Sequence, residues 1–289
     1  MGDASHMFLL ELSSALPLGF NFQDLSDEIS RTDIPYRQHY SEYQSGGWWT
    51  CSLLGRSADP TDGAVTDTGR PVATDALDKL PVVRGFLEDL GLRYMMVRVA
   101  RLDPGGALWE HRDYQDLNRV PRQRIHLPLE TNPGALIVSG GRRFHMNSGS
   151  LQTFRPTVAH GACNAGNRAR LHLMIDVYED DRLKSLLTEA TPLPSRAMPE
   201  LSPAALADTV RCLRMTLTCR DDDTGRTLRP GRLAQWEQAV LGLYFAFSVA
   251  EGEIYEALEE ACLENGQRER AEFWAARRRL TLGMGLADA

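Results

Sequence analysis

The stretch RARLHLMIDVY, residues 168–178, alternates apolar and polar side chains in the way that a β-strand with one face in a hydrophobic core does. It is the last of six short segments of this kind between residues 92 and 180, separated by Pro, Gly, Asn and Asp. Short strands with turn signals at this density predict a sandwich or a jelly roll. The other five segments are LRYMMVRVARL (92–102), QRIHLPLET (123–131), GALIVSG (134–140), RRFHMNSG (142–149) and SLQTFRP (150–156).

The residues before this core have a mixed pattern. FQDLSDEIS (22–30) and ALDKLPVVRGFLEDLG (76–91) have helical spacing, and Gly91 is a typical helix stop. GGWWTCSLLG (46–55) has the composition of a strand, and a polar loop follows it at residues 56–74. We therefore expect an N-terminal lead-in that mixes helices and strands.

The residues after the core become helical. Beyond the Pro-rich stretch at 191–203, residues 232–266 and 267–283 carry apolar side chains at intervals of three and four. The sequence thus predicts an α+β protein in two parts. Residues 1–190 form the lead-in and the core, which itself spans about 92–180, and residues 191–289 form a C-terminal helical domain.

Composition and charge restrict the function. The chain has 289 residues and a net charge of −7, which argues against a nucleic-acid binder with a dense basic face. It contains no run of 18 apolar residues and no N-terminal secretory pattern, so we expect neither a membrane span nor export. The five cysteines form no CxxC pair, which favours reduced thiols and a cytoplasmic location. Residues 1–6 look like an expression remnant, with the natural start at Met7.

The segment LWEHRDYQDL, residues 108–117, contains the pattern His-x-Asp at His111 and Asp113. Two histidines and one carboxylate can hold Fe(II) on one face and leave three coordination positions open. Side chains that flank one residue at a strand end can converge on one ion, whereas the intervening Arg112 should point away, and we assign it no role. His-x-Asp alone is a weak signal, because a loop can carry such a pair without any metal.

A second histidine must come from a distant strand. His160 lies 47 residues after Asp113, with four or five predicted strand segments between them, and this is a natural return distance in a jelly roll. Among the other histidines, His145 fits a structural role on its strand. His172 either shares the face of Arg170 or belongs to the core.

Four longer segments resemble the aspartyl/asparaginyl β-hydroxylase-like branch of the Fe(II)/2-oxoglutarate oxygenases. Within this branch they look most like the bacterial hydroxylases of free L-proline and pipecolic acid. The C-terminal helical region is also similar, so the resemblance covers roughly residues 40–280. The four segments are VARLDPGGALWEHRDYQDL (99–117), RQRIHLPLETN (122–132), FHMNSGSLQTF (144–154) and AHGACNAGNRARLHLMID (159–176).

The resemblance implies a double-stranded β-helix, which is a cupin-like jelly roll, with Fe(II), 2-oxoglutarate and O2 as the reactive components. His111, Asp113 and His160 would bind Fe(II). Arg170 would pair with the 5-carboxylate of 2-oxoglutarate, because a guanidinium matches a carboxylate with two parallel hydrogen bonds. His126 would lie near the 1-carboxylate end of the same molecule.

The resemblance also implies substrate contacts. Arg124 lies on the same strand face as His126 and, like Arg98, would approach the carboxylate of an amino-acid substrate. Two positions depart from the proline enzymes: Gln152 stands where they carry a bulky aromatic residue, and Arg155 where an acidic or apolar residue is expected. The identity of the amino acid therefore stays open.

The resemblance, together with the two arginines, favours the hydroxylation of an unactivated C–H bond of a small free L-amino acid, with proline or pipecolic acid as lead candidates, in natural-product biosynthesis. Asp113 argues against halogenation, which needs an open coordination position for halide. The alternatives are an acyclic amino acid, a peptide residue, desaturation or epimerisation at the same centre, and a non-catalytic cupin-like protein that binds a metal or a small acid. The C-terminal helices could cover the mouth of the barrel, form a homodimer interface, or do both.

Overall fold

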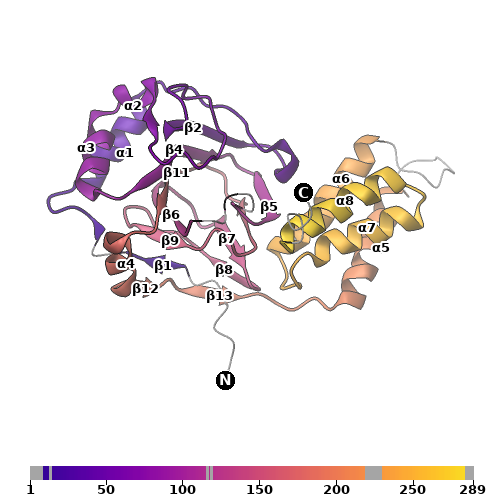
Figure 1. Ribbon diagram of the computed structural model, residues 1–289. Coiled ribbons are helices and arrows are strands. Elements are labelled where there is room, and N and C mark those ends of the chain that lie inside the picture. The colour runs from indigo at the N-terminus through magenta and orange to yellow at the C-terminus, as the bar shows by residue number, and fades with distance from the viewer. Residues whose placement is uncertain (1–8, 13–14, 115–116, 118–119, 219–229, 284–289) are drawn as a thin grey trace.

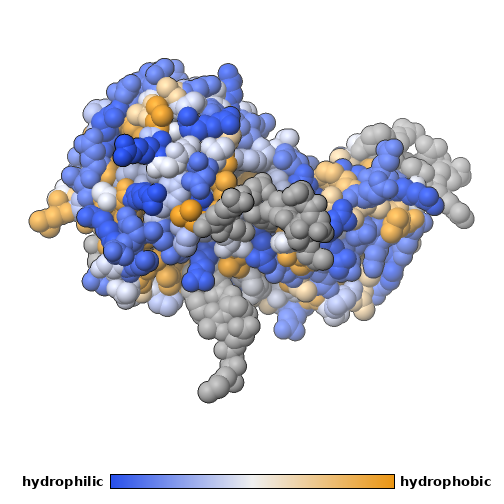
Figure 2. All heavy atoms as spheres, viewed as in Figure 1, coloured by the Kyte–Doolittle hydropathy of each residue, from blue (hydrophilic) through white to orange (hydrophobic). Residues whose placement is uncertain are grey.

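The computed structural model describes residues 9–12, 15–114, 117, 120–218 and 230–283. Figure 1 shows a β-rich lobe that carries the N-terminal helices and, beside it, a lobe built from the C-terminal helices. No helix in these ranges is long and apolar enough to cross a membrane. On the face seen in Figure 2, hydrophilic residues predominate on both lobes and hydrophobic ones are dispersed among them.

The β-rich lobe contains two sheets, and every ladder described between their strands is antiparallel. This confirms the expected α+β class with an antiparallel two-sheet core. In spatial order, the larger sheet is β12 (Thr191–Pro192), β1 (Leu10–Glu11), β9 (Gln152–Phe154), β6 (Arg122–Glu130), β11 (Arg170–Tyr178), β4 (Tyr94–Leu102), β2 (Trp48–Gly55) and β3 (Val72–Ala73). The smaller sheet is β13 (Ser195–Ala197), β8 (Arg142–Phe144), β7 (Ala135–Ser139), β10 (His160–Asn164) and β5 (Ala107–His111).

Each of the six predicted segments contains one strand of these sheets. The strands β5 and β10, which begin or end at a histidine of the predicted metal site, were not among the six. Both are short, and β10 reads HGACN, which lacks the alternation of a half-buried strand.

The strand β11 shows why the inner face of the larger sheet is polar. Its apolar residues, such as Leu173 and Ile175, point to one side and join the main core with the N-terminal helices. Its even-numbered residues point to the other side, because successive side chains of a strand alternate between faces. Arg170 and Asp176 are therefore buried together with Met174 on the side of the smaller sheet.

The N-terminal helices cover the outer face of the larger sheet (Figure 1). Helix α1 (Phe22–Arg31) begins at Asn21, whose side chain accepts a hydrogen bond from the backbone of Gln23 at 3.0 Å. The predicted helix at 76–91 forms two helices, because Pro81 cannot donate a backbone hydrogen bond and begins a helix of its own. These are α2 (Asp75–Asp78) and α3 (Pro81–Leu90), and α3 ends at Gly91 as expected.

In the described residues, the C-terminal lobe contains four α-helices with a shared core. The region 232–266, predicted as helical from its apolar spacing, leaves the helical conformation between residues 246 and 252, and Gly252 has a φ of 75° before the next helix begins. The helices are α5 (Pro203–Thr218), α6 (Pro230–Gly242), α7 (Glu253–Glu264) and α8 (Arg268–Thr281). The shorter α4 (Asp181–Thr188) and the 3₁₀ turns η2 (Ser41–Tyr43) and η4 (Leu243–Phe245) complete the helical elements described.

The two lobes meet at strand β5. Trp109 packs into the helical core together with Trp236 and Tyr255. Glu110 is 4% exposed and accepts a hydrogen bond from the backbone of Gly252 at 3.1 Å. Residues 191–197 still pair with the two sheets, and the four helices begin at Pro203. The domain boundary at 190/191 stays a prediction.

Candidate active site

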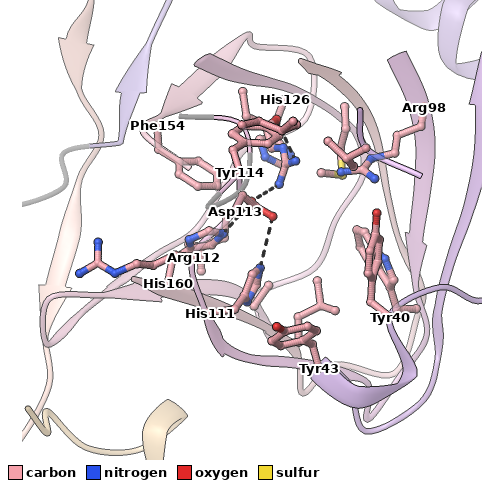
Figure 3. Close-up of a pocket in the computed structure, with 18 of the residues that line it drawn as sticks. Tyr40, Tyr43, Arg98, His111, Arg112, Asp113, Tyr114, His126, Phe154 and His160 are labelled. Carbon is pink, nitrogen blue, oxygen red and sulfur yellow. Dashed lines mark hydrogen bonds and ion pairs between the residues drawn. The ribbon is translucent and has the colours of Figure 1, made fainter. Parts of the chain in front are cut away.

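The pairing of β5 with β10 brings the predicted metal ligands together. His111 and His160 are direct partners in this antiparallel ladder, and their ring centroids lie 4.4 Å apart. Asp113 follows β5, where its backbone N–H donates to the carbonyl of Pro156 at 2.9 Å. One donor atom from each of the three residues lies within 4.8 Å of the other two. Figure 3 shows the three side chains pointing into one cavity.

Hydrogen bonds to the backbone orient both histidines. Nδ1 of His111 lies 2.6 Å from the carbonyl oxygen of Trp109, and Nδ1 of His160 lies 2.8 Å from that of Val158. Because a carbonyl only accepts, each ring carries its proton at Nδ1 and keeps the lone pair of Nε2 for another partner. Burial and the neighbouring His160 lower the pKa of His111 to about 4, so this imidazole is neutral at pH 7, as a metal ligand must be.

The carboxylate of Asp113 is held in its ionised form. Burial alone would raise its pKa, but the Arg124 guanidinium and the two imidazoles hold the pKa well below its usual range. Oδ2 of Asp113 pairs with Nη1 of Arg124 and lies 3.5 Å from Nε2 of His160, while Oδ1 lies 3.9 Å from Nε2 of His111. Two imidazoles and one carboxylate on a single face match the donor set that Fe(II) takes in a facial triad. The residues present therefore fit this metal.

Arg124 is already engaged within the protein. Besides Asp113, its guanidinium contacts Oδ1 of Asp176 at 2.7 Å and the hydroxyl of Tyr114 at 3.0 Å. Arg98 lies nearby with Nη2 at 3.7 Å from Oδ2 of Asp176, while its Nε and Nη1 have no hydrogen-bond partner among the described residues. Asp176 therefore pairs with two buried arginines. Of these two, Arg98 has N–H donors that remain available for a further anion.

Arg170 is buried beside two histidines and has no carboxylate partner in the described part of the chain. Its Nε and Nη2 lie 3.0 and 3.1 Å from the ring nitrogens of His172, and Nη1 has no hydrogen-bond partner among the residues that the structure describes. His172 in turn lies 3.1 Å from Nδ1 of His126, whose Nε2 is also without a partner. Burial lowers the pKa of Arg170 to about 10. A buried cation with an unused donor is costly unless an anion joins it, so this corner fits a carboxylate of 2-oxoglutarate.

A single cavity of about 420 Å³ connects these groups. All seven residues predicted for the site line it, which brings the metal triad and the basic residues together in one space. The seven are Arg98, His111, Asp113, Arg124, His126, His160 and Arg170. Its apolar lining includes Trp48, Met174 and, from the far end of the chain, Leu280.

Sequence reasoning missed several residues of this cavity. Tyr40 and Tyr114 line it and are the two non-glycine residues with positive φ in the described ranges, at 59° and 62°. Such backbone conformations cluster at functional sites. Nothing in the sequence marks Tyr40, whereas Tyr114 directly follows His-x-Asp. The alternation of RLHLMID places Asp176 on the face of Arg170, and this was the signal that could have found it.

Three further residues considered in the sequence analysis, His145, Gln152 and Arg155, lie outside the cavity lining. Nδ1 of His145 lies 3.1 Å from the carbonyl oxygen of Ala135, and His145 does not line the cavity. Gln152 is buried and donates to the carbonyl of Asn147 at 3.0 Å. Arg155 is exposed. Neither of these two residues lines the cavity.

Comparison with known proteins identifies the family. The aspartyl/asparaginyl β-hydroxylase family model matches residues 20–180. An L-proline cis-4-hydroxylase from Rhizobium meliloti (strain 1021) is 28% identical over 163 residues, which are 54% of this chain and 57% of that protein. The match thus spans little more than half the length of that relative.

Two solved structures show a distant likeness. A 2OG-Fe(II) oxygenase-family oxidoreductase from Burkholderia pseudomallei has a TM-score of 0.39 and 13% identity, covering 60% of this chain and 85% of that one. A prolyl-4-hydroxylase from Pseudomonas putida has a TM-score of 0.35 and 15% identity, covering 61% and 94%. The family match spans more than half of the chain and includes all the predicted site residues. The chain therefore belongs to the aspartyl/asparaginyl β-hydroxylase family.

Proposed function

We propose that this protein hydroxylates an unactivated C–H bond of a small free L-amino acid, with proline or pipecolic acid as lead candidates, to supply a building block for a natural product. The supporting observation is that two buried arginines line the same cavity as His111, Asp113 and His160. Arg170 and Arg98 each keep an unpartnered donor and line the same cavity. Two acids, the co-substrate and the amino acid, can therefore be held at once.

The residues have distinct proposed roles. His111, Asp113 and His160 would hold Fe(II), which together with 2-oxoglutarate and O2 supplies the oxidising chemistry when bound. Arg170 would receive the 5-carboxylate of 2-oxoglutarate, and His126 would lie near its 1-carboxylate end. These side chains bind and orient; the hydrogen bonds to the Nδ1 atoms keep both imidazoles turned toward the cavity.

The substrate carboxylate would bind Arg98. Arg124 was predicted for the same role, and it lines the cavity, but its contacts with Asp113 and Asp176 favour a role in fixing the metal-binding carboxylate. That both arginines contact substrate stays a prediction. A cavity of about 420 Å³ suits small molecules, and its apolar wall would pack against the hydrocarbon part of an amino acid. Placement of one C–H bond toward the metal would then decide which carbon reacts.

A panel of free amino acids tests this function. We expect L-proline or L-pipecolate to stimulate succinate formation from 2-oxoglutarate in the presence of Fe(II), with a product one oxygen atom heavier. Mass and NMR spectra of the product distinguish hydroxylation from desaturation and epimerisation. Succinate formation that no free amino acid stimulates would reject the proposal and point to a peptide substrate. No 2-oxoglutarate consumption under any condition would favour a binding protein.

Replacement of Arg98 tests the substrate carboxylate site. The variant Arg98→Met should raise the KM for the amino acid on the order of 100-fold, because truncating one partner of a buried charge pair typically costs several kcal/mol. The KM for 2-oxoglutarate should stay unchanged, since Arg170 is retained. Arg101→Met, on the same strand but half-exposed and paired with Asp103, is the matched control. Equal KM values in the Arg98 variant and the wild type would exclude this role.

A further inference from the structure

Arg112, the residue between two of the proposed metal ligands, belongs to the cavity lining, but its guanidinium points away from His111 and Asp113 and reaches the helical lobe (Figure 3). Its guanidinium contacts three separate segments. Nε donates to the carbonyl of Thr281 at 2.5 Å, Nη1 donates to the carbonyl of Thr157 at 2.6 Å, and Nη2 pairs with the carboxylate of Glu251. One side chain thus joins strand β5 to the helices and to the segment that leads into His160.

The three partners of Arg112 lie at the end of α8, before β10 and before α7. Thr281 is the last residue of α8, where carbonyls lack partners within the helix and a positive charge is favourable. Thr157 lies three residues before His160 on the approach to β10. Glu251 lies just before α7. A guanidinium suits such a junction because it presents several donors in a fixed plane, which lysine does not.

Neighbouring contacts reinforce the same junction. On the other side of His111, the backbone carbonyl of Glu110 accepts a hydrogen bond from the hydroxyl of Tyr255 at 2.6 Å. The guanidinium of Arg277, on α8, lies 4.1 Å from the ring centroid of Tyr43, which lines the cavity. The helical lobe therefore contacts the residues before and after the histidine ligand as well as the cavity wall.

Helix α8 also reaches the cavity itself. Leu280, next to the residue that Arg112 holds, lines the cavity although it lies 169 residues after His111. Its side chain is half-buried and belongs to the apolar part of the lining. A residue at this place restricts the space beside the triad in proportion to its size.

We propose that the end of α8 forms a specificity-determining wall of the substrate pocket, and that Arg112 is the positioning residue that fixes this wall to both ligand-bearing segments. The C-terminal helices are then part of the oxygenase site. The size selection by Leu280 rests on the proposed amino-acid function. We call the three contacts of the Arg112 guanidinium with Thr281, Thr157 and Glu251 the clamp. The clamp does not depend on the proposed function.

Amide hydrogen exchange on the full chain tests the clamp without metal or substrate. In Arg112→Ala, amides near the end of α8 and around residues 157–160 should exchange about tenfold faster or more, because the contacts that oppose local opening are lost. Arg112→Lys keeps the charge but cannot reach three acceptors, so it should restore only part of the protection. Arg279→Ala, at an exposed position of α8, is the control. Unchanged exchange in Arg112→Ala would overturn the clamp.

Cobalt binding tests whether the clamp holds the proposed metal ligands in position. Anaerobic titration of the full chain with Co(II), followed by its visible absorption, should show about tenfold weaker binding and an altered spectrum for Arg112→Ala, as expected when a residue that orients ligands is removed. The Arg279→Ala protein should match the wild type. An Arg112→Ala protein that binds Co(II) with wild-type affinity and spectrum would contradict a positioning role, even if its helix exchanges faster.

Variants at Leu280 test the wall. Leu280→Ala should shift kcat/KM toward larger amino acids and Leu280→Trp toward smaller ones, by about tenfold each, since added or removed volume in an apolar pocket discriminates on this scale. The KM for 2-oxoglutarate should not change. Leu263→Ala, at an exposed position of α7, is the control. Identical substrate ratios in all variants would overturn the wall. If the wild type accepts no free amino acid, the proposed function fails, while exchange and cobalt binding still decide the clamp.

Discussion

Replacing Asp113 by alanine is expected to reduce turnover at least ~1000-fold, to background. The substitution removes the anionic ligand from the triad and leaves two imidazoles, which no longer complete the facial donor set for Fe(II). A bound metal contributes several kcal/mol to catalysis, which corresponds to a loss of this size. Succinate release and Co(II) absorption measure the effect on turnover and on metal binding separately. His111→Ala should have the same outcome.

The control for this experiment is Asp181→Ala, which removes an exposed carboxylate at the start of α4. Asp113→Asn is a stricter variant, because it keeps the shape of the side chain and removes only its charge. It should bind Co(II) weakly and show no turnover. Full activity of either alanine variant, without added ligands, would reject the metal site assigned to these residues.

Replacing Arg170 by methionine is expected to stabilise the ligand-free protein and to destroy its response to 2-oxoglutarate. The lowering of the arginine pKa from 12.5 to about 10 corresponds to roughly 3 kcal/mol of unfavourable free energy for the charged form in the folded state. Methionine fills a similar space without a charge, so the melting temperature should rise by several degrees. The KM for 2-oxoglutarate should rise about 100-fold or more, because the carboxylate loses its paired cation.

Thermal unfolding with and without 2-oxoglutarate measures both effects at once. A ligand that binds only the folded state raises the melting temperature, so the wild type should gain stability on addition of 2-oxoglutarate and the variant should not. Arg168→Met, two residues earlier and exposed, should behave like the wild type. A variant that melts lower than the wild type, or that 2-oxoglutarate still stabilises, would show that Arg170 has another partner.

Much of the site could be predicted because it follows from alternation within single strands. Arg124 and His126 share a face of β6, and the same rule places Arg170 and Asp176 on one face of β11. What the rule does not provide is the pairing between strands. Asp176 is opposite Arg124 in the ladder and also lies near Arg98 of β4, so its role in fixing both arginines depends on a register that only the fold defines.

The contacts of the helical lobe were beyond sequence reasoning for a related reason. The hydrogen bond from Arg112 to Thr281 joins residues 169 positions apart, and no local pattern encodes such a pair. The single helix predicted at 76–91 was wrong because Pro81 begins a new helix. The helical spacing at 232–266 gives no sign that residues 246–252 leave the helical conformation. In both regions the apolar spacing continued past a local break in the backbone.

The edge position of β5 has a consequence for the solubility of the β-rich lobe. An outer strand exposes unpaired backbone groups that can template intermolecular strand pairing and aggregation. In this protein residues 44 and 45 bond to β5 at that edge, and the helical lobe covers Trp109 beside it. The same helices that contact the ligand-bearing strand therefore also protect the sheet from association. A β-rich lobe without these helices would expose the indole of Trp109 and the backbone carbonyl of Glu110, so its resistance to aggregation depends on its helical partner.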